Sequence, residues 1–361
     1  MRVGCGVIRG RRIAGLVWGE GMGRMGNREQ NSNEKRARLA PALFVVVLLV
    51  SFVLMNVLPD GEVPAFLSVA TAGSLEGSAG LLDGLGLDGG ASGDLAAVVL
   101  QILREGALAA VAVAAVAIAV PSALHWSLRG KRAPGLRLGP GFVVAMLAVG
   151  LLGGAFSVSA AMNGGELFGV AGCVQALLQG FGFVAEAVIV AILGGPNVWC
   201  IVLLLAVLAL LTGLFEEAFM RVLGTETVVD GLRARGVEKR RAVLLAAVVT
   251  SVIFALLHVG VPAEGSGVAG WLQMAGRFLQ TGLFGFCMVG LYEQSKSLWP
   301  CALLHAGFNL LYLNVFPFAP DMALVYGSGA LSVSMLLAMT TICLAPLAVR
   351  AHRVMAASAD E

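Results

Sequence analysis

The sequence predicts an all-α fold, a polytopic transmembrane bundle of about eight helices. Of the 361 residues, 58% are hydrophobic and only 13% are charged, whereas soluble domains carry roughly 25% charged residues. The apolar residues also gather in runs of about 20, the length that a helix needs to cross a bilayer. We therefore expect an integral membrane protein whose partner is the lipid bilayer. This composition makes nucleic acid an unexpected partner.

The N-terminal segment, residues 1–39, is expected to be a basic cytoplasmic tail. It holds nine Lys or Arg residues and no apolar run long enough for the core of a signal peptide. The N-terminal membrane region, residues 40–197, begins with a span over about 43–58. The glycine-rich, acidic stretch at about 59–94 is predicted to be a flexible outer loop, because glycine favours irregular chain.

Two further spans are predicted in this region, over about 107–126 and 142–162. The first ends at a basic cluster, which indicates a short cytoplasmic turn: Arg129, Lys131, Arg132 and Arg137. Gly150 and Gly154 form a small-xxx-small spacing in the second, but among 48 glycines such a match is weak. The segment 168–193 is interrupted by polar residues and could span, lie at the interface or re-enter.

The core is predicted over residues 198–349, with a C-terminal tail at 350–361. Its first helix starts near Val198 and continues toward a basic cluster at 233–241. Later spans are expected at about 242–259, 271–292, 298–316 and 322–349. If 168–193 does not cross, there are eight spans and the basic loops all lie in the cytoplasm; nine spans would put 233–241 outside. The positive-inside bias favours eight.

Glu216 and Glu217 stand side by side at the end of a long apolar run. Ionised carboxylates within a membrane helix cost roughly 2.5 kcal/mol or more each, so such residues usually have a function. Glu217 and Arg221 are spaced i,i+4 and can form an ion pair, whereas Glu216 is rotated by about 100° around the helix. The two carboxylates are therefore expected to have separate roles.

His258, His305 and Asn309 are the other polar residues of interest in the apolar core. His305 and Asn309 are spaced i,i+4, so they share one helix face. If Gly236 is the turn of a helical hairpin, Glu216 and His258 both lie about 30 Å from that turn and can face one another. In the eight-span arrangement, His305 follows the cytoplasmic loop 296–300 by only a few residues, so something must bend or sink. Pro300 and its polar neighbours are compatible with a loop that dips into the protein, but the sequence alone does not settle the point.

This set of residues is suited to peptide hydrolysis. A buried carboxylate beside imidazoles can take a proton from water, and an Asn amide with a His can donate to the oxyanion that forms on the carbonyl. A metal ion bound by two imidazoles and a carboxylate would serve the same ends.

Three motifs resemble those of the CPBP family of intramembrane proteases, which includes CAAX-processing and bacteriocin-processing members. Residues 216–221 (EEAFMR) are similar to the EExxxR motif, 254–258 (FALLH) to FxxxH, and 305–309 (HAGFN) to HxxxN. Each motif is short, but three in the family's order are a strong joint signal. The resemblance covers about 198–316, and Val222 departs from the glycine that many members carry after the arginine.

The resemblance implies a role for each residue. Glu216 would be the base that activates water, His258 would orient it, and His305 with Asn309 would stabilise the oxyanion. The site would be braced by Glu217, Arg221 and Phe254. A divalent metal, zinc, is also implied, with His258, His305 and Glu216 as its ligands, although a metal-free mechanism uses the same residues coherently.

The substrate implied is a peptide or a membrane-anchored protein, and whether it is prenylated stays open. Two other classes of function would also retain these residues. A proton- or ion-coupled transporter would be expected to show internal repeats, which we do not find, and a non-catalytic scaffold or immunity-type protein would keep them for packing. The abundance of Ala, Gly and Arg suggests a bacterial inner membrane as the location.

Overall fold

The computed structural model describes residues 39–57, 91–126, 138–162, 195–259, 267–312 and 330–357, together with 175, 178, 179 and 181. Within these ranges the chain is helical and has no strand, which confirms the predicted fold class. The α-helices are α2 (Ala40–Val57), α5 (Ala91–Ala119), α6 (Pro140–Met162), α8 (Gly195–Glu216), α9 (Thr225–Ala234), α10 (Lys239–His258), α11 (Gly267–Ser295), α12 (Leu298–Tyr312) and α14 (Ala330–Ala357).

Each of the eight predicted spans overlaps one continuous helical segment of the structure. A π-helical segment, η3 (Glu217–Gly224), joins α8 to α9, so one such continuous segment runs from Gly195 to Ala234. Among the described residues, five helices are long and apolar enough to cross a membrane, and the apolar helices at Ala40–Leu54 and Pro140–Phe156 are shorter. The protein is therefore an integral membrane protein. The ambiguous segment 168–193 lies almost entirely outside the described residues.

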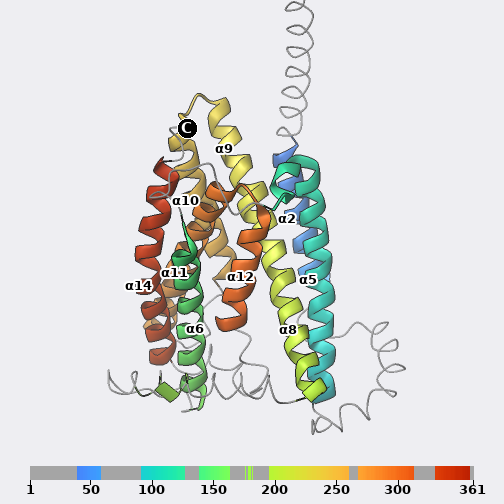
Figure 1. The fold of residues 1–361 in the computed structure, drawn as a ribbon, viewed down its shortest axis with the longest axis vertical. Coiled ribbons are helices and arrows are strands. Elements are labelled where there is room, and N and C mark those ends of the chain that lie inside the picture. The colour runs from blue at the N-terminus through green and yellow to red at the C-terminus, as the bar shows by residue number, and fades with distance from the viewer. Residues whose placement is uncertain are drawn as a thin grey trace, which may run out of the picture.

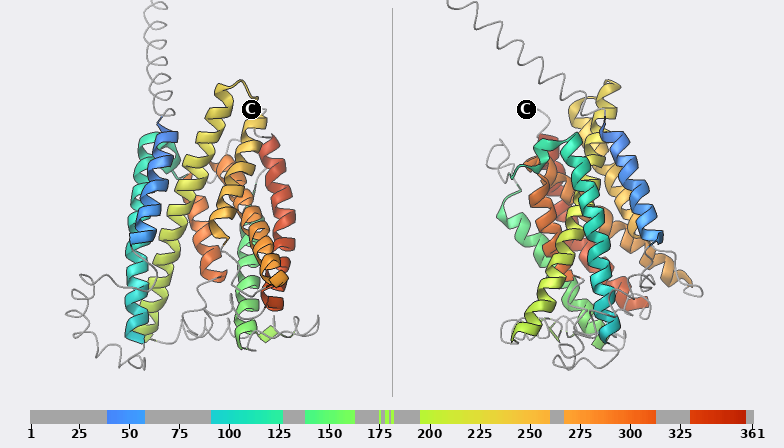
Figure 2. Two further views of the ribbon diagram at one scale, coloured as in Figure 1. Left: turned by 180° about the vertical axis from the view of Figure 1, so that it is seen from behind. Right: turned by 90° about the vertical axis from the view of Figure 1, so that its right-hand side faces the viewer.

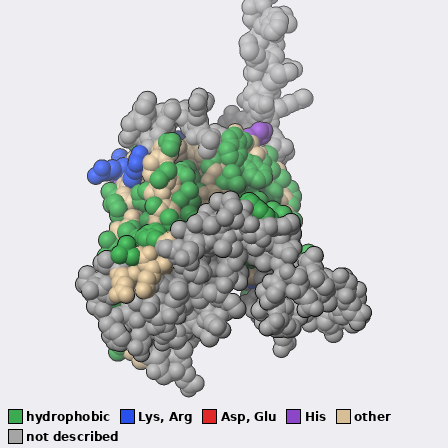
Figure 3. Space-filling view, turned by 60° about the horizontal axis from the view of Figure 1, so that its bottom comes forward, with side chains coloured by type: hydrophobic (Ala, Val, Ile, Leu, Met, Phe, Trp, Pro, Cys, Tyr) green, Lys and Arg blue, Asp and Glu red, His purple; other side chains and the backbone are tan. Residues whose placement is uncertain are grey.

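The helices form an upright bundle, and the basic residues of the α9–α10 turn and of the end of α14 lie at one end of it. Figures 1 and 2 show the α9–α10 turn and the C-terminal end of α14 at the same end of the bundle. The basic residues of the turn are exposed there, and Arg350 and Arg353 lie near the end of α14. Figure 3 shows a described surface dominated by hydrophobic side chains, with Lys and Arg gathered in one place. The positive-inside rule predicts that this end faces the cytoplasm.

The helical hairpin predicted around Gly236 is present. The backbone N–H of Gly236 donates to the carbonyl of Arg233, and that of Val237 donates to Leu232. Gly236 has φ of 81°, a left-handed conformation that costs little for glycine and ends α9. α10 then packs back along α9, which brings residues far apart in sequence to a similar depth.

The turn between α11 and α12 sinks into the protein, as the position of His305 requires. Ser297 and Leu298 are fully buried. The hydroxyl of Ser297 donates to the carbonyl of His125 at 2.7 Å, and Nε1 of Trp299 donates to the carbonyl of Leu124 at 2.8 Å. Both acceptors belong to the short 3-10 turn η1 (Pro121–Leu124) and the residue after it. α12 therefore starts inside the bundle, beneath this turn.

A charged cluster ties this buried turn to α9. Nζ of Lys296 lies 3.1 Å from Glu226 and 2.7 Å from Glu293, and the hydroxyl of Tyr292 donates to Glu226 at 2.8 Å. Burial alone would lower the pKa of Lys296, but the carboxylates of Glu226 and Glu293 outweigh that effect and hold its pKa above the ordinary value. Lys296 is therefore a permanent cation between two helices.

Glycines on two neighbours let α12 approach closely. A Cβ on Gly213 of α8 would stand 2.7 Å from the carbonyl oxygen of Ala302. On α6, a Cβ on Gly150 would stand 3.1 Å from the carbonyl of Phe308, and one on Gly154 would overlap the carbonyl of Leu311. The glycine spacing that carried no weight in the sequence therefore has a packing role, because it lets α6 support α12.

Two helices extend beyond their predicted limits. α5 begins at Ala91 rather than near 107, and Arg104 lies 3.7 Å from Glu105 within it. α14 continues to Ala357, so Arg350 and Arg353 lie on a helix rather than on a tail. The N-terminal tail, residues 1–38, and the basic residues 129–137 lie outside the described residues, as does most of the glycine-rich loop.

Candidate active site

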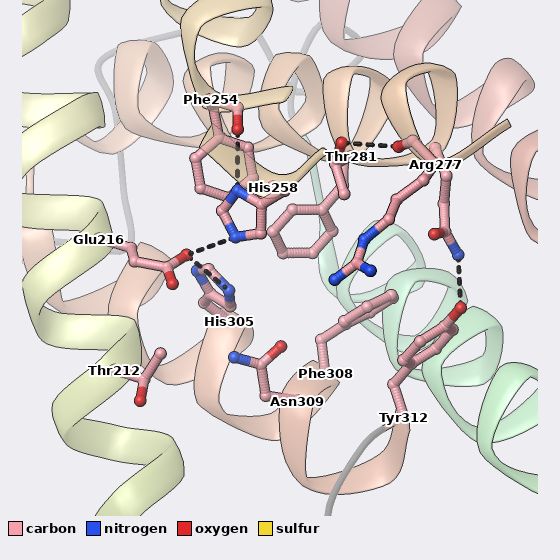
Figure 4. A pocket seen from close by; sticks show the side chains of 12 residues that line it. Thr212, Glu216, Phe254, His258, Arg277, Thr281, His305, Phe308, Asn309 and Tyr312 are labelled. Carbon is pink, nitrogen blue, oxygen red and sulfur yellow. Dashed lines mark hydrogen bonds and ion pairs between the residues drawn. The ribbon is translucent and has the colours of Figure 1, made fainter. Parts of the chain in front are cut away.

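The candidate residues from three motifs line one cavity of about 160 Å³. Glu216 comes from the end of α8, His258 from the end of α10, and His305 and Asn309 from α12. Figure 4 shows these side chains turned toward a common centre, with Phe254 beside them. The rest of the wall is formed by Thr212, Arg277, Gln280, Thr281, Phe284, Phe308 and Tyr312.

Glu216 faces both imidazoles. Its Oε2 lies 3.5 Å from Nε2 of His305 and 3.7 Å from Nε2 of His258. These distances are longer than hydrogen bonds, as is common for catalytic groups without substrate. The side chain of Glu216 is 17% exposed and that of His258 is 30% exposed. Both groups therefore remain accessible from the cavity.

Each histidine is oriented through its other ring nitrogen. Nδ1 of His258 lies 2.8 Å from the carbonyl oxygen of Phe254, one helical turn earlier. Since a carbonyl oxygen only accepts, Nδ1 carries the proton and Nε2 is the atom that faces Glu216. The ring of His258 also packs on that of Phe254, with centroids 4.2 Å apart. The FxxxH spacing thus fixes both the position and the tautomer of this histidine.

Glu217 lies behind the cavity and holds two partners. Its Oε1 is 2.7 Å from Nδ1 of His305, and its Oε2 is 3.3 Å from Nε of Arg221. Glu217 and Arg221 are both completely buried. The ion pair with Arg221 was predicted from the sequence. The bond to His305, across 88 residues, was missed because i,i+4 spacing reports only on contacts within one helix.

The two glutamates occupy a junction between helix types. Glu216 ends α8 and Glu217 begins η3, the π-helical segment that contains Arg221. π-helical turns are rare and occur often at functional sites, because the wider turn changes the direction of side chains. At this junction Glu216 points into the cavity, while Glu217 points to His305 and Arg221.

Arg221 is packed between a carboxylate and an aromatic ring. Its guanidinium carbon lies 4.3 Å from the centroid of Phe254. A Cβ on Gly285 of α11 would approach Nη2 of Arg221 to 3.4 Å, so the glycine leaves room for the guanidinium. A cation–π contact in a desolvated place contributes up to about 2 kcal/mol. Phe254 therefore links the buried ion pair to the ring of His258.

His305 and Asn309 share the face of α12 that borders the cavity, as their i,i+4 spacing predicts. The ring of Phe284 packs edge-on against His305, with centroids 4.8 Å apart. His305 is almost fully buried, whereas Asn309 is half-buried. The Asn309 amide lines the cavity beside His305, where it can donate to a substrate oxygen.

One wall of the cavity was not predicted from the sequence. Arg277 of α11 lines it, together with Gln280 and Tyr312. Nε2 of Gln280 donates to the hydroxyl of Tyr312 at 2.8 Å and to that of Thr340 at 2.6 Å, which joins α11, α12 and α14. A signal did exist: Arg277 is a lone basic residue in the middle of an apolar span.

The donor set was tested for a metal ion. Glu216 with two imidazoles, each anchored through Nδ1, is the chemistry of a zinc site with oriented ligands. Within the described ranges, however, no group of three or more His, Cys, Asp or Glu side chains is placed to hold a metal ion. A zinc ion held by Glu216, His258 and His305 therefore stays a prediction.

Comparison with known proteins agrees with the three motifs. A family model described as "Rce1-like: Type II CAAX prenyl endopeptidase Rce1-like" matches residues 197–311. No curated protein and no solved structure was found to match the chain. The matched residues run from the start of α8 to the end of α12 and contain every motif residue of the cavity. The resemblance stated from the sequence is confirmed: residues 197–311, which carry the three motifs, are similar to the Rce1-like members of the CPBP/CAAX protease family.

Proposed function

We propose that this protein is an intramembrane endopeptidase that hydrolyses a peptide bond in or near the bilayer. The observation that carries the proposal is the position of the Glu216 carboxylate, which faces Nε2 of both His258 and His305 in one cavity. A carboxylate, two imidazoles and an amide supply the base, the orienting group and the oxyanion donors that this reaction needs.

The reaction begins with a water molecule in the cavity. Glu216 accepts a proton from that water while Nε2 of His258 accepts a hydrogen bond and orients it. The water oxygen attacks the carbonyl carbon of the substrate. The charge that develops on the carbonyl oxygen is stabilised by donors from Nε2 of His305 and the amide of Asn309. The carbon–nitrogen bond then breaks, and Glu216 returns its proton to the leaving amine.

Glu217 and Arg221 support this chemistry without touching the substrate. The Glu217 carboxylate accepts from Nδ1 of His305. In the proposed oxyanion role His305 carries a proton on each ring nitrogen, so that Nδ1 donates to Glu217 while Nε2 donates to the oxyanion. Arg221 balances that charge in a place from which water is excluded.

The substrate class follows from the membrane setting. The matched family is described by its action on prenylated CAAX proteins; for this chain we propose a peptide or a membrane-anchored protein, with or without a prenyl group. Leader peptides, anchored regulators and bacteriocin-like peptides are all of this class. We place the protein in the inner membrane of a bacterium, on the basis of its Ala-, Gly- and Arg-rich composition.

The test compares proteomes of membranes that contain the wild-type protein, Glu216→Gln or Glu238→Gln. Glu238 is exposed at the start of α10, far along the helix from the cavity, so its substitution is the matched control. Cleavage products should appear with the wild type and with Glu238→Gln and disappear with Glu216→Gln. Equal cleavage in all three membranes would contradict the proposal. The zinc content of purified wild-type and His258→Ala protein tests the metal separately.

A further inference from the structure

The cavity has a second polar end, which the mechanism does not use. Arg277, Gln280 and Thr281 of α11 meet Tyr312 of α12 there. Figure 4 shows Arg277 across the cavity from Glu216, with its guanidinium turned toward the rings that lie between them. Figure 4 shows the ring of Phe308 between Arg277 and the catalytic residues, and the ring of Phe284 packs on it with centroids 4.6 Å apart. The cavity therefore joins a catalytic end to a cationic end through an aromatic middle.

Arg277 projects from a braced wall. Thr281 Oγ1 donates to the carbonyl of Arg277 at 2.7 Å. Three residues after Arg277, Gln280 is held by Tyr312 and Thr340. One residue before it, Gly276 packs against Leu337 of α14, where a Cβ would stand 3.1 Å from that of leucine. The wall is thus fixed by α11, α12 and α14 together.

Arg277 places a positive charge on the wall of the cavity, within a long apolar helix. A basic residue near the centre of a membrane helix costs roughly 2.5–3.5 kcal/mol and usually marks a substrate path. Arginine stays protonated, and its planar fork of donors matches the two oxygens of a carboxylate.

We propose that Arg277 recognises a carboxylate of the substrate and so sets which peptide bond reaches Glu216. The inference rests on the proposed function and adds a specificity residue to it. The carboxylate is either the C-terminus of the peptide or an acidic side chain. Both present the same two oxygens to the guanidinium, and the experiment separates them.

The geometry also limits the distance from the carboxylate to the cleaved bond. Phe284 packs on His305, and Arg277 lies seven residues earlier on the same helix, which is about 10 Å along its axis. An extended peptide covers about 3.3 Å per residue. The recognised carboxylate therefore lies within about three residues of the scissile bond.

Binding is measured in the Glu216→Gln protein, which keeps the cavity but should not cleave. One probe pair is N-acetyl-leucyl-leucine as the free acid and as the carboxamide. The other pair is N-acetyl-leucyl-glutamyl-leucinamide and its glutaminyl analogue. We expect the acid of one pair to bind roughly 10- to 100-fold more tightly than its neutral partner, as for a hydrogen bond to a charged group. The pair that shows the preference identifies the source of the carboxylate.

Adding Arg277→Gln should abolish this preference, and Arg277→Lys should keep part of it, because lysine retains the charge but not the fork. Arg241→Gln is the control, since Arg241 is 79% exposed at the start of α10. Equal binding within both pairs would overturn the inference. So would an Arg277→Gln protein that loses affinity for acid and neutral probes alike, which indicates a structural role.

The acid-to-neutral ratio is measured within one preparation, so partial unfolding of a variant does not alter it. The ratio is also independent of cleavage. Suppose that the acid preference depends on Arg277, while membranes with wild-type and Glu216→Gln protein show the same cleavage products. The proposed function then fails, and the carboxylate site stands. If products depend on Glu216 but no preference is found, only the carboxylate site fails.

Discussion

Nδ1 of His305 lies 2.7 Å from Oε1 of Glu217, although 88 residues separate them in the chain. The second oxygen of Glu217 holds Arg221. One buried carboxylate therefore orients an imidazole on one side and balances a guanidinium on the other.

Replacing Glu217 by glutamine keeps the size of the side chain but removes its charge. Removing one partner of a buried ion pair costs about 3–5 kcal/mol, because the other charge is left uncompensated. We expect a lower thermal midpoint in detergent together with a large drop in kcat. The double variant Glu217→Gln/Arg221→Met removes both charges and should regain stability without regaining activity. Recovery of kcat in the double variant would show that the Glu217 charge does not act on His305.

Phe254→Leu tests the link between the ion pair and His258. The substitution removes the ring over Arg221 and the ring under His258 while keeping an apolar side chain. We expect a loss of stability of about 1–3 kcal/mol, from a lost cation–π contact and a smaller core residue. Activity should fall by more than the folded fraction does, since the imidazole loses its support. Activity that falls only in proportion to folded protein would limit Phe254 to packing.

Gly154→Ala tests the contact between α6 and α12. An added Cβ would overlap the carbonyl of Leu311, so α12 would have to shift and carry Asn309 with it. We expect lower stability and lower activity, seen by thermal unfolding and by cleavage of a membrane substrate. Gly141→Ala on the same helix is the control, since a Cβ there has nothing within 4 Å. If both variants behave alike, the close approach of α6 is not needed.

Lys296→Met tests the cluster at the buried turn through its pH dependence. The folded protein binds the Lys296 proton more tightly than the unfolded chain, whose pKa is 10.5. The stabilisation by this proton is therefore fully present below pH 10.5 and is lost as the pH rises through the higher pKa of the folded state.

The side chain of Lys296 is 52% exposed, so the effect should not exceed about 1 kcal/mol. Wild-type and Lys296→Met proteins should differ in free energy of unfolding by a constant amount between pH 7 and pH 9, and the difference should shrink above pH 10.5. Lys239→Met, at the exposed start of α10, is the control. A difference that does not change with pH would assign the stabilisation to packing of the lysine stem.

Much of the fold could be predicted because membrane helices are specified locally. The apolar runs predicted the membrane helices, and Gly236 predicted the helical hairpin that places Glu216 opposite His258. The contact of Glu217 with His305 and the cavity wall at Arg277 could not be predicted in this way. Both depend on how α11 and α12 pack, and hydrophobic periodicity does not determine the rotation of a helix that is apolar on every side.

The sequence was compatible with a loop 296–300 that dips into the protein, but it did not identify the groups that hold the loop there. The bonds from Ser297 and Trp299 reach the carbonyls of His125 and Leu124. Backbone acceptors of this kind are present at every residue, so the sequence does not mark which of them is used. The π-helical segment at Glu217 likewise has no signature in the residues that form it.

The short central helix has a mechanical consequence. α12 has 15 residues, about 22 Å at 1.5 Å per residue, which is less than the hydrocarbon thickness of about 30 Å. Only Leu303 on it is exposed, and α6, α8 and α11 surround the rest. Its depth is thus set by protein neighbours rather than by lipid. When a bilayer thickens or thins, the outer helices can tilt to match it, while His305 and Asn309 keep their depth within the protein.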